Sequence, residues 1–458
     1  MNAGKSGNAI TEGVIWKQLL LFFFPIMLGM LFQQMYNIVD TVVVGQFVGT
    51  QALAAVGASA PLTRLLIGFF MGISSGATVV LSLHYGAKNE RGVHDAIHTG
   101  MAVAVAGGFL ATVGGIAVTP AILRLIDTPE SCLADCILYT CIFFGGSIPS
   151  LVYNMGSGLL RAMGDSRRPM IFLIIGCVIN IILDLFFVVV LKWGVAGAAI
   201  ATVTSQCISA VMVVWVLMHL PGESRLNWAE VRFKKTLLVS ILRIGLPAGM
   251  QCVMFDVSNL IIQAGINNFG DITVAAWTAI GKADAIVWLI CNAFGMAITT
   301  FVGQNFGARN YQRVRQSVRI CMAMCVATMG TLCALLAVFR YPVLSIFTPD
   351  AAVIETGAYI ILCTSALAFA YGPVEIFSGA MRGTGYSLVP TVIIGFCACF
   401  FRVIWIAFVS NRLQTLLSLC IAYPITWTMA TLVFAAVYLH GGWLKKRIAA
   451  SDAAHELA

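Results

Sequence analysis

Largely apolar runs of 20 or more residues recur along the sequence and limit the chain to a membrane-spanning fold. A helix rises about 1.5 Å per residue, so about 20 apolar residues cross the roughly 30 Å hydrocarbon layer of a bilayer. The short alternating segments typical of a β-barrel do not occur. The sequence therefore predicts an all-α membrane protein. We expect twelve transmembrane helices, at residues 17–43, 52–83, 94–119, 133–157, 169–191, 194–219, 237–265, 273–302, 318–339, 353–379, 388–409 and 415–439.

Charged residues are few and unevenly distributed. They make up 10% of the chain, whereas a soluble protein would carry about 25%. If both termini are cytoplasmic, 20 of the 27 Lys and Arg residues fall in cytoplasmic segments and only four, Arg124, Lys192, Arg340 and Arg412, fall outside. This bias predicts cytoplasmic termini by the positive-inside rule. It also accounts for the net charge of +8, so nucleic acid is not an expected partner.

The two halves of the sequence resemble each other at a constant offset of 221 residues. GAKN at 86–89 matches GARN at 307–310, and SGLLRAMG at 157–164 matches SGAMRGTG at 378–385. An even number of helices per half gives both halves the same orientation, so this is a parallel repeat. We expect two pseudo-symmetric six-helix bundles around a central cavity, which favours a transporter over a channel. The predicted organisation is an N-terminal bundle at 1–220 with a cation site, a cytoplasmic linker at 221–235 and a C-terminal bundle at 236–458.

Polar residues within the apolar runs of the first half indicate where a cation could bind. A carboxylate inside the membrane costs at least ~2.5 kcal/mol, so Asp40 and Asp184 should face protein or water. Asn180 precedes Asp184 by four residues and shares its helix face. Counting residues places Asp40, Asp184 and Thr202 at a similar depth, roughly 10 Å from the outer end of their helices. Tyr36 and Asn37 are accessory candidates one turn from Asp40.

Two carboxylates with an amide and a hydroxyl suit a monovalent cation such as Na⁺. They suit equally a carboxyl pair of which one member binds a proton, because close like charges favour protonation of one of them. The other interpretation of these residues is a set of unrelated polar contacts between helices. The sequence does not decide between Na⁺ and H⁺.

The second half has no copy of this group, because Phe401 and Trp405 stand at the equivalents of Asn180 and Asp184. Its apolar runs contain three other acids. We expect Asp256 and Glu375 to be candidates for the wall of the substrate cavity, where a carboxylate would attract a cationic compound. For Asp284 we expect a structural ion pair, with Lys282 or Arg402 as the partner.

Cysteine and histidine give little sign of a further site. The 14 Cys are scattered, with no CxxC and no Cys/His cluster, so no transition-metal site is expected. The six His lie in predicted loops or at helix ends, which argues against a histidine proton relay. Several glycines and prolines, including Gly145, Gly146, Pro149, Gly372 and Pro373, predict kinks in the fourth and tenth helices.

Taken together, these features resemble the multidrug and toxic compound extrusion (MATE) transporters. The resemblance covers nearly the whole chain. It includes PIMLGMLFQQMYNIVDTVVVGQFVG in the first helix, the paired GAKN and GARN loops, SGLLRAMGDSRRP after the fourth helix, and Asn180 with Asp184. The set of Asp40, Asn180, Asp184 and Thr202 is similar to the cation site of the DinF/MepA-like branch. Asp256 resembles in position the acid on which the NorM-type branch relies.

The resemblance implies a secondary antiporter, not an enzyme, in the prokaryotic cytoplasmic (inner) membrane. Entry of Na⁺ or H⁺ would drive export of organic, often cationic and amphipathic compounds, with antibiotic resistance as a consequence. No cofactor is expected beyond the coupling ion. The expected partners are small organic molecules and the lipid bilayer, and the expected state is a monomer.

Two other functions were considered. A flippase for lipid-linked precursors or polysaccharides must hold anionic phosphates, yet only Arg64, Lys282 and Arg402 lie within the apolar runs, against five acids. An intramembrane aspartyl protease would use Asp40 and Asp184 as a catalytic pair. Neither residue lies in a GxGD motif, and a six-helix repeat has no role in that chemistry.

Overall fold

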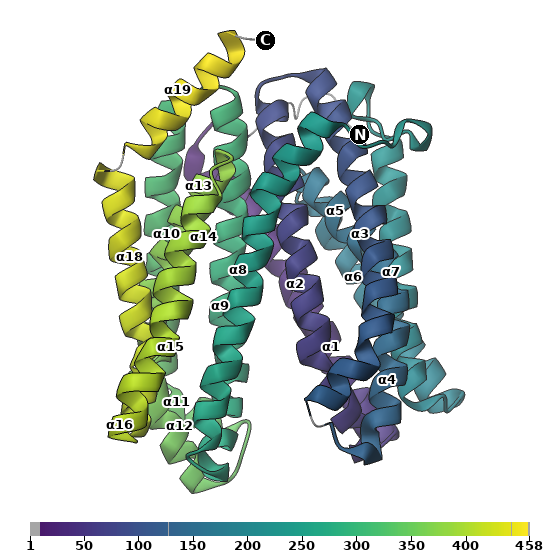
Figure 1. Ribbon diagram of the computed structural model, residues 1–458, viewed down its shortest axis with the longest axis vertical. Helices are drawn as coiled ribbons and strands as arrows, with labels where there is room; N and C mark the ends of the chain where they lie inside the picture. Colours follow the sequence, from purple (N-terminus) through teal and green to yellow (C-terminus); the bar gives the residue numbers. More distant parts are fainter. Residues whose placement is uncertain (1–9, 127, 441, 457–458) are drawn as a thin grey trace. The chain divides into compact units, whose positions relative to one another are not determined.

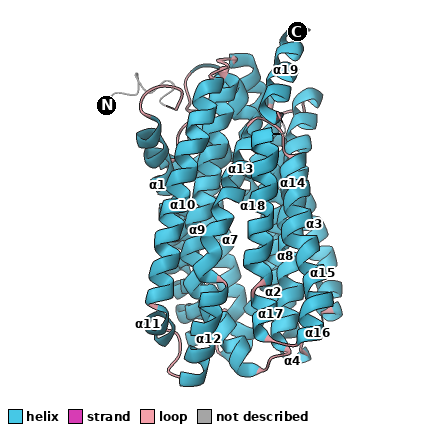
Figure 2. Ribbon diagram, turned by 90° about the vertical axis from the view of Figure 1, so that its left-hand side faces the viewer, coloured by secondary structure: helices cyan, strands magenta, loops and turns pink. Residues whose placement is uncertain are grey.

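The computed structural model describes residues 10–126, 128–440 and 442–456. These residues form helices and connecting loops, and no strand occurs among them (Figure 2). Within the described residues, eleven helices are long and apolar enough to cross a membrane, and a bent pair raises the number to as many as twelve. The predicted class, an all-α polytopic membrane protein, is confirmed.

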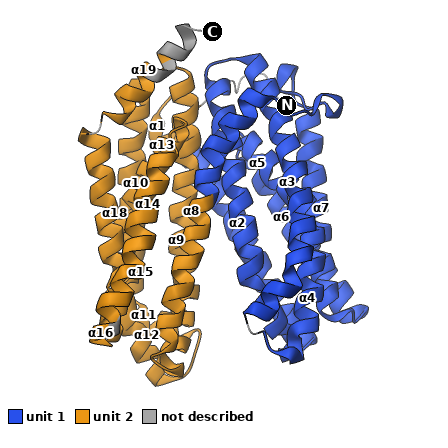
Figure 3. Ribbon diagram, in the orientation of Figure 1, with its two compact units in different colours: residues 1–9, 20–249 blue, residues 10–19, 250–458 orange. Residues whose placement is uncertain are grey.

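The chain divides into two compact units (Figure 3). Within the described residues, unit 1 comprises residues 20–249 and unit 2 comprises 10–19 and 250–456. The boundaries therefore fall inside two long helices, α1 (Ile15–Phe47) and α8 (Lys235–Asn267). The short linker between α7 and α8, which contains the 3-10 turns η2 (Gly222–Ser224) and η3 (Trp228–Glu230), belongs to unit 1.

Unit 1 holds the helices of the first half. After α1 they are α2 (Thr50–Gly86), α3 (Glu90–Leu125), α4 (Glu130–Gly145), α5 (Ser147–Ala162), α6 (Arg167–Asp184) with its π-helical extension η1 (Leu185–Val190), and α7 (Gly194–Met218). Helix α5 packs against α2, α3 and α7, and α6 packs against α7 (Figure 1). Their buried apolar side chains form one core, to which the start of α8 also contributes.

Unit 2 contains the helices of the second half. They are α8, α9 (Asp271–Gly307), α10 (Tyr311–Val338), α11 (Arg340–Ser345), α12 (Ala351–Cys363), η4 (Ser365–Tyr371), α13 (Gly372–Gly383), α14 (Leu388–Ile394), η5 (Gly395–Phe400), α15 (Phe401–Trp405), η6 (Ile406–Ser410), α16 (Asn411–Leu413), α17 (Leu416–Cys420), α18 (Ala422–His440) and α19 (Trp443–Glu456). Helix α9 packs against α10, α12 and α13. Helices α14 and α15, with η5 and η6, make one continuous span over Leu388–Ser410.

The sequence repeat is visible in the backbone. Residues with positive φ recur at the same offset of 221: Gly49 and Gly270, Lys88 and Arg309, Gly164 and Gly385. The π-helical segments η1 and η6 also correspond. Each pair marks the same turn or irregularity in its half, so the repeat extends from sequence to local geometry.

The predicted bend in the fourth span lies at Gly146. Helices α4 and α5 meet there at 48°. A side chain on Gly146 would overlap Val203 of α7, so the close approach requires glycine. The break frees backbone carbonyls, and the Thr112 hydroxyl donates to one of them, that of Phe144, at 2.8 Å. A bent helix is tolerated in a membrane when such groups find new partners.

Small residues explain why the start of α8 belongs to unit 1. A side chain at Gly72 or Gly76 of α2 would overlap the α8 backbone around Gly245 and Gly249. Glycines let helix backbones approach closely, and close van der Waals contact drives helix association in lipid. The unit boundary follows the last of these glycines.

Candidate cation site

Polar side chains from three helices of unit 1 form one buried group. Asp40 lies on α1, Asn180 and Asp184 on α6, and Thr202 on α7, and these are 6%, 0%, 0% and 2% exposed. The Asp40 and Asp184 carboxylates interact electrostatically. Tyr36, one turn before Asp40, interacts with both carboxylates and lies beside Thr202. The residues that the sequence singles out at this depth therefore lie together.

The helix that carries Asn180 and Asp184 changes geometry directly after them. Helix α6 ends at Asp184 and the π-helical segment η1 begins at Leu185. The backbone N–H of Leu191 donates five residues back, to the carbonyl of Phe186, at 2.9 Å. Such π-helical turns are rare in proteins and are frequent at functional sites.

The site contains polar atoms that no protein group satisfies. Six buried atoms have no hydrogen-bond partner: Oη of Tyr36, Oδ1 of Asp40, Oδ1 and Nδ2 of Asn180, and both carboxylate oxygens of Asp184. A buried polar group without a partner costs about 1–3 kcal/mol, and an unpaired charge costs more. A group of this kind is stabilised by a ligand that supplies positive charge. Five of the six atoms are oxygens, which are the donors that hard cations such as Na⁺ prefer.

No basic side chain in the described part of the chain forms an ion pair with either acid. The ion pairs among the described residues join Glu230 to His94, Asp165 to Arg168, Asp95 to Lys234 and Glu375 to Arg382. Neither Asp40 nor Asp184 takes part in one. Since charges at this depth are expected to be paired or to bind an ion, the two carboxylates are left with a bound cation or a proton as their counter-charge.

The remaining candidates of the first half differ in position. The Thr202 hydroxyl donates to the carbonyl of Ala198 at 3.0 Å, which leaves its lone pairs free to accept or to coordinate. Asn37 is exposed and does not join the buried group. Tyr139 of α4, which the sequence did not single out, is buried and interacts with both carboxylates. An aromatic residue inside an apolar run carries no signal that could have marked it.

In the second half, Glu375 has a basic partner. Its Oε1 accepts a hydrogen bond from Nη2 of Arg382 at 3.1 Å. Arg382 lies about two turns further along α13. The carboxylate is buried against Gly295 of α9, where any side chain would overlap it. Asp256 of α8 is half-buried. Glu375 thus sits in a helix interface with its charge compensated.

The expected ion pair of Asp284 is wrong. Its carboxylate accepts a hydrogen bond from the Ser365 hydroxyl at 2.8 Å. Lys282 is exposed. It lies two residues before Asp284, and residues two apart do not face each other on a helix. Arg402 is 1% exposed and lies instead over the ring of Tyr423, 4.3 Å from its centroid, and donates to Thr426 at 3.2 Å.

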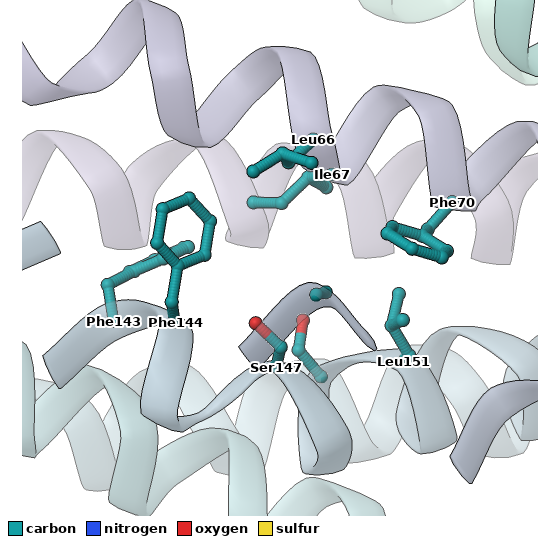
Figure 4. A pocket seen from close by; sticks show the side chains of 9 residues that line it. Leu66, Ile67, Phe70, Phe143, Phe144, Ser147 and Leu151 are labelled. Carbon is teal, nitrogen blue, oxygen red and sulfur yellow. The ribbon is translucent and has the colours of Figure 1, made fainter. Parts of the chain in front are cut away.

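An apolar pocket lies at the bend between α4 and α5. Its accessible volume is about 20 Å³, about the space of one water molecule and far below the range for ligand pockets. In Figure 4, Leu66, Ile67 and Phe70 of α2 face Phe143, Phe144, Ser147 and Leu151 across it. The pocket is therefore a small packing gap within unit 1 and not a ligand site.

Comparison with known proteins decides the family. The MatE family model matches residues 25–186 and 247–408, which is more than half of the chain. The chain belongs to the MatE family. The two matches cover the two sequence repeats, and the first includes Asp40, Asn180 and Asp184. MATE proteins are transporters and not enzymes, as the sequence predicted.

Named relatives agree with this family. The chain is 29% identical over 449 residues to the probable multidrug resistance protein YoeA of Bacillus subtilis, covering 95% of each chain. It is 32% identical over 317 residues to the probable multidrug resistance protein YpnP of the same species, covering 66% of this chain and 68% of the relative. These matches favour a multidrug transporter over a flippase.

A solved structure shows the same fold. It is described as the outward-facing conformation of a multidrug resistance MATE family transporter of the MOP superfamily. It matches with a TM-score of 0.88 at 21% identity, over 97% of this chain and all of the other. The predicted family and fold are confirmed.

Proposed function

We propose that this MATE protein is a secondary active antiporter that exports organic, often cationic and amphipathic compounds in exchange for Na⁺ or H⁺. The observation that carries the proposal is the buried group around Asp40 and Asp184, with two acids, no basic partner and six unsatisfied polar atoms. Such a group is stable when it holds a small positive ion. A small cation that enters and a cationic compound that leaves would then compete for the same negatively charged protein, which is the basis of the proposed exchange.

The energetics of exchange are sufficient. One unit charge that crosses a membrane potential of 100 mV releases about 2.3 kcal/mol. An ion can shift a conformational equilibrium only by the difference between its affinities for the two states. Binding at Asp40 and Asp184 would neutralise the group and change how α1, α6 and α7 pack. The two six-helix bundles are the proposed moving parts, and the linker at 221–235 would move with the first of them, because unit 1 continues into the start of α8.

The neutral ligands allow Na⁺ and H⁺ to be told apart. A proton needs only a carboxylate, whereas Na⁺ needs several oxygens, to which Asn180 and Thr202 would contribute. We expect Asn180→Ala to weaken activation by Na⁺ at least tenfold if the protein is Na⁺-coupled. If it is H⁺-coupled, the same variant should keep its dependence on the pH gradient. Asp256 and Glu375 are proposed only as secondary acids near the substrate path.

The charge distribution supports one orientation of the protein. Basic residues number 20 on the side of the termini and four on the other, so we place both termini in the cytoplasm. From the family resemblance we further propose that the protein is a monomer in a prokaryotic cytoplasmic (inner) membrane. A fluorescent protein that folds only in the cytoplasm, fused after residue 458, should fluoresce. Fluorescence lost at the C-terminus and recovered in a fusion placed after Lys192 would reverse the orientation.

Dye efflux from cells tests the proposed function. Cells that express the wild type should export ethidium, and export should collapse when the driving ion gradient is removed. Na⁺ and external pH are varied separately, so that the coupling ion is identified. Asp40→Asn and Asp184→Asn should each abolish active export, because an amide cannot balance a cation's charge.

The matched control is Asp165→Asn, the same substitution at a partly exposed loop residue that caps α6. It should export at the wild-type rate. Expression of all variants is checked by immunoblot of isolated membranes. Unchanged export in Asp40→Asn or Asp184→Asn at normal expression would remove that residue from the coupling role.

A further inference from the structure

Away from the cation site, the linker between the halves meets α3 through two histidines and a glutamate. His94 and His98 lie four residues apart on α3, and their rings stack with centroids 4.0 Å apart. Glu230 lies in η3 of the linker, and its Oε2 is 2.9 Å from Nε2 of His94. One potential ligand atom from each of the three residues lies within 4.8 Å of the other two. All three belong to unit 1.

Neighbouring groups orient these side chains as they do around a bound metal. Nδ1 of His98 donates to the carbonyl of His94 at 2.7 Å, so its Nε2 carries the lone pair. That lone pair accepts the backbone N–H of Asn227 at 3.0 Å. The side chain of Asn227 donates to Oε1 of Glu230 at 2.7 Å, which turns Oε2 toward His94.

The group is accessible from one side. The side chains of His94 and Glu230 are 22% and 49% exposed, whereas His98 is buried at 2%. His94, Asn227 and Glu230 line a hollow of about 1040 Å³, including the space at its mouth, and Glu223 lines it too. An ion can therefore enter from solvent and reach the buried histidine at the back.

We propose that His94, His98 and Glu230 bind a divalent transition metal of the Zn²⁺ class. Two imidazole nitrogens and one carboxylate oxygen are the ligand set that such ions prefer. The metal would lie between Nε2 of His94 and Oε2 of Glu230, and the proton that His94 carries on Nε2 would move through solvent to its Nδ1. At His98 the metal would bind the Nε2 lone pair that now accepts the N–H of Asn227. Asn227 is exposed, so its released N–H is satisfied by water. Water or Glu223 supplies the fourth ligand.

This site would fasten the linker to the first half of the protein. The linker is already held to α3 by the ion pair of Lys234 with Asp95 and by the hydroxyl of Thr99, which donates to the carbonyl of Arg232 at 3.4 Å. From the sequence we expected no transition-metal site, because it contains no CxxC and no Cys/His cluster. Glu230 is distant from the histidines in the chain. The fold brings the third ligand to an i, i+4 histidine pair.

Metal titration of the purified full-length protein tests the proposal. The protein in detergent is stripped with a chelator, and Zn²⁺ is added in a calorimeter. We expect one Zn²⁺ per chain. Co²⁺ should give the visible bands of a tetrahedral site without the near-ultraviolet charge-transfer band of a thiolate ligand, which separates this site from the 14 cysteines.

The variants are Glu230→Gln and His94→Gln, each of which removes one proposed ligand. Each should weaken Zn²⁺ binding by about 100-fold, since changes to residues behind the ligands already cost about 10–100-fold. Glu230→His supplies a third imidazole and should retain binding. The control is His219→Gln, which alters an exposed histidine at the end of α7 outside the group. Thermal unfolding of the stripped proteins should be the same for wild type and for Glu230→Gln, whose changed residue is exposed.

Three results would overturn the metal site. They are the absence of stoichiometric Zn²⁺ binding by the wild type, equal affinity in Glu230→Gln and wild type, and a thiolate band in the Co²⁺ spectrum. None of them bears on ion-coupled export, which depends on Asp40 and Asp184.

Discussion

Replacing Asp184 with asparagine should stabilise the protein in the absence of its ion. Both carboxylate oxygens of Asp184 are buried without a partner, and no basic side chain among the described residues pairs with them. Without a bound cation or proton, the folded protein carries an uncompensated charge at this position. Asparagine keeps the shape of the side chain and removes the charge.

The magnitude follows from the cost of unsatisfied buried groups. A neutral buried polar group without a partner costs about 1–3 kcal/mol, and a charged one costs more. Because the asparagine amide would itself lack a partner, the gain is only the extra cost of the charge, which we take as roughly 1–3 kcal/mol for Asp184→Asn in Na⁺-free buffer at alkaline pH. For a unit of about 200 residues, 1 kcal/mol shifts Tm by about 2–4 °C, so the gain corresponds to roughly 2–12 °C.

Thermal unfolding of the purified protein in detergent measures this. Adding the coupling ion, as Na⁺ or by acidification, should stabilise the wild type by about 2.7 kcal/mol at an ion concentration 100 times its Kd and so raise its Tm. The same addition should leave Asp184→Asn unchanged. Asp165→Asn is the control, because the Asp165 carboxylate already has partners: Oδ1 accepts hydrogen bonds from two backbone N–H groups, each at 3.1 Å. It should be neutral or lose up to about 1 kcal/mol. If Asp184→Asn melted below the wild type without ion, its carboxylate would already be satisfied and the reasoning would be refuted.

Two further substitutions probe the packing of the helices. Gly76→Ala should destabilise the protein by about 1–3 kcal/mol, because the new Cβ would overlap the carbonyl oxygen of Ile241. Gly57→Ala on the same helix is the control and should be neutral, because its Cβ would contact nothing. Thermal unfolding of the two variants measures the difference. Glu375→Leu should cost about 3–5 kcal/mol by leaving Arg382 buried without its partner, and combining it with Arg382→Met should recover most of that loss in the same assay. Equal stability of the single and double variants would show that the pair is not coupled.

The apolar runs predicted the spans well because a membrane requires long apolar helices. The first span, expected at 17–43, is α1 (Ile15–Phe47), and the seventh, expected at 237–265, is α8 (Lys235–Asn267). The extra turns at their ends are too polar or too short to register in an apolar run. The same reason hides α19 (Trp443–Glu456), which follows the last span and carries five charged residues.

Contacts between distant segments could not be read from the sequence. Arg313 donates to the carbonyls of Ile10, Glu12 and Gly13, which ties the segment before α1 into unit 2. No local pattern marks a guanidinium that binds backbone oxygens 300 residues away. The buried group at Asp40 was predictable because an acid in an apolar run has few inexpensive positions.

Transport by purified protein in liposomes tests the coupling role of Asp40 and Asp184 most directly. A gradient of Na⁺ or of H⁺ is imposed one at a time, and the distribution of ethidium across the membrane is measured. A tenfold gradient is worth about 1.4 kcal/mol, so one-for-one exchange with the wild type should move ethidium to about a tenfold ratio. Asp40→Asn and Asp184→Asn should leave the ratio at one under either gradient. Uphill movement of ethidium by either variant would contradict the account.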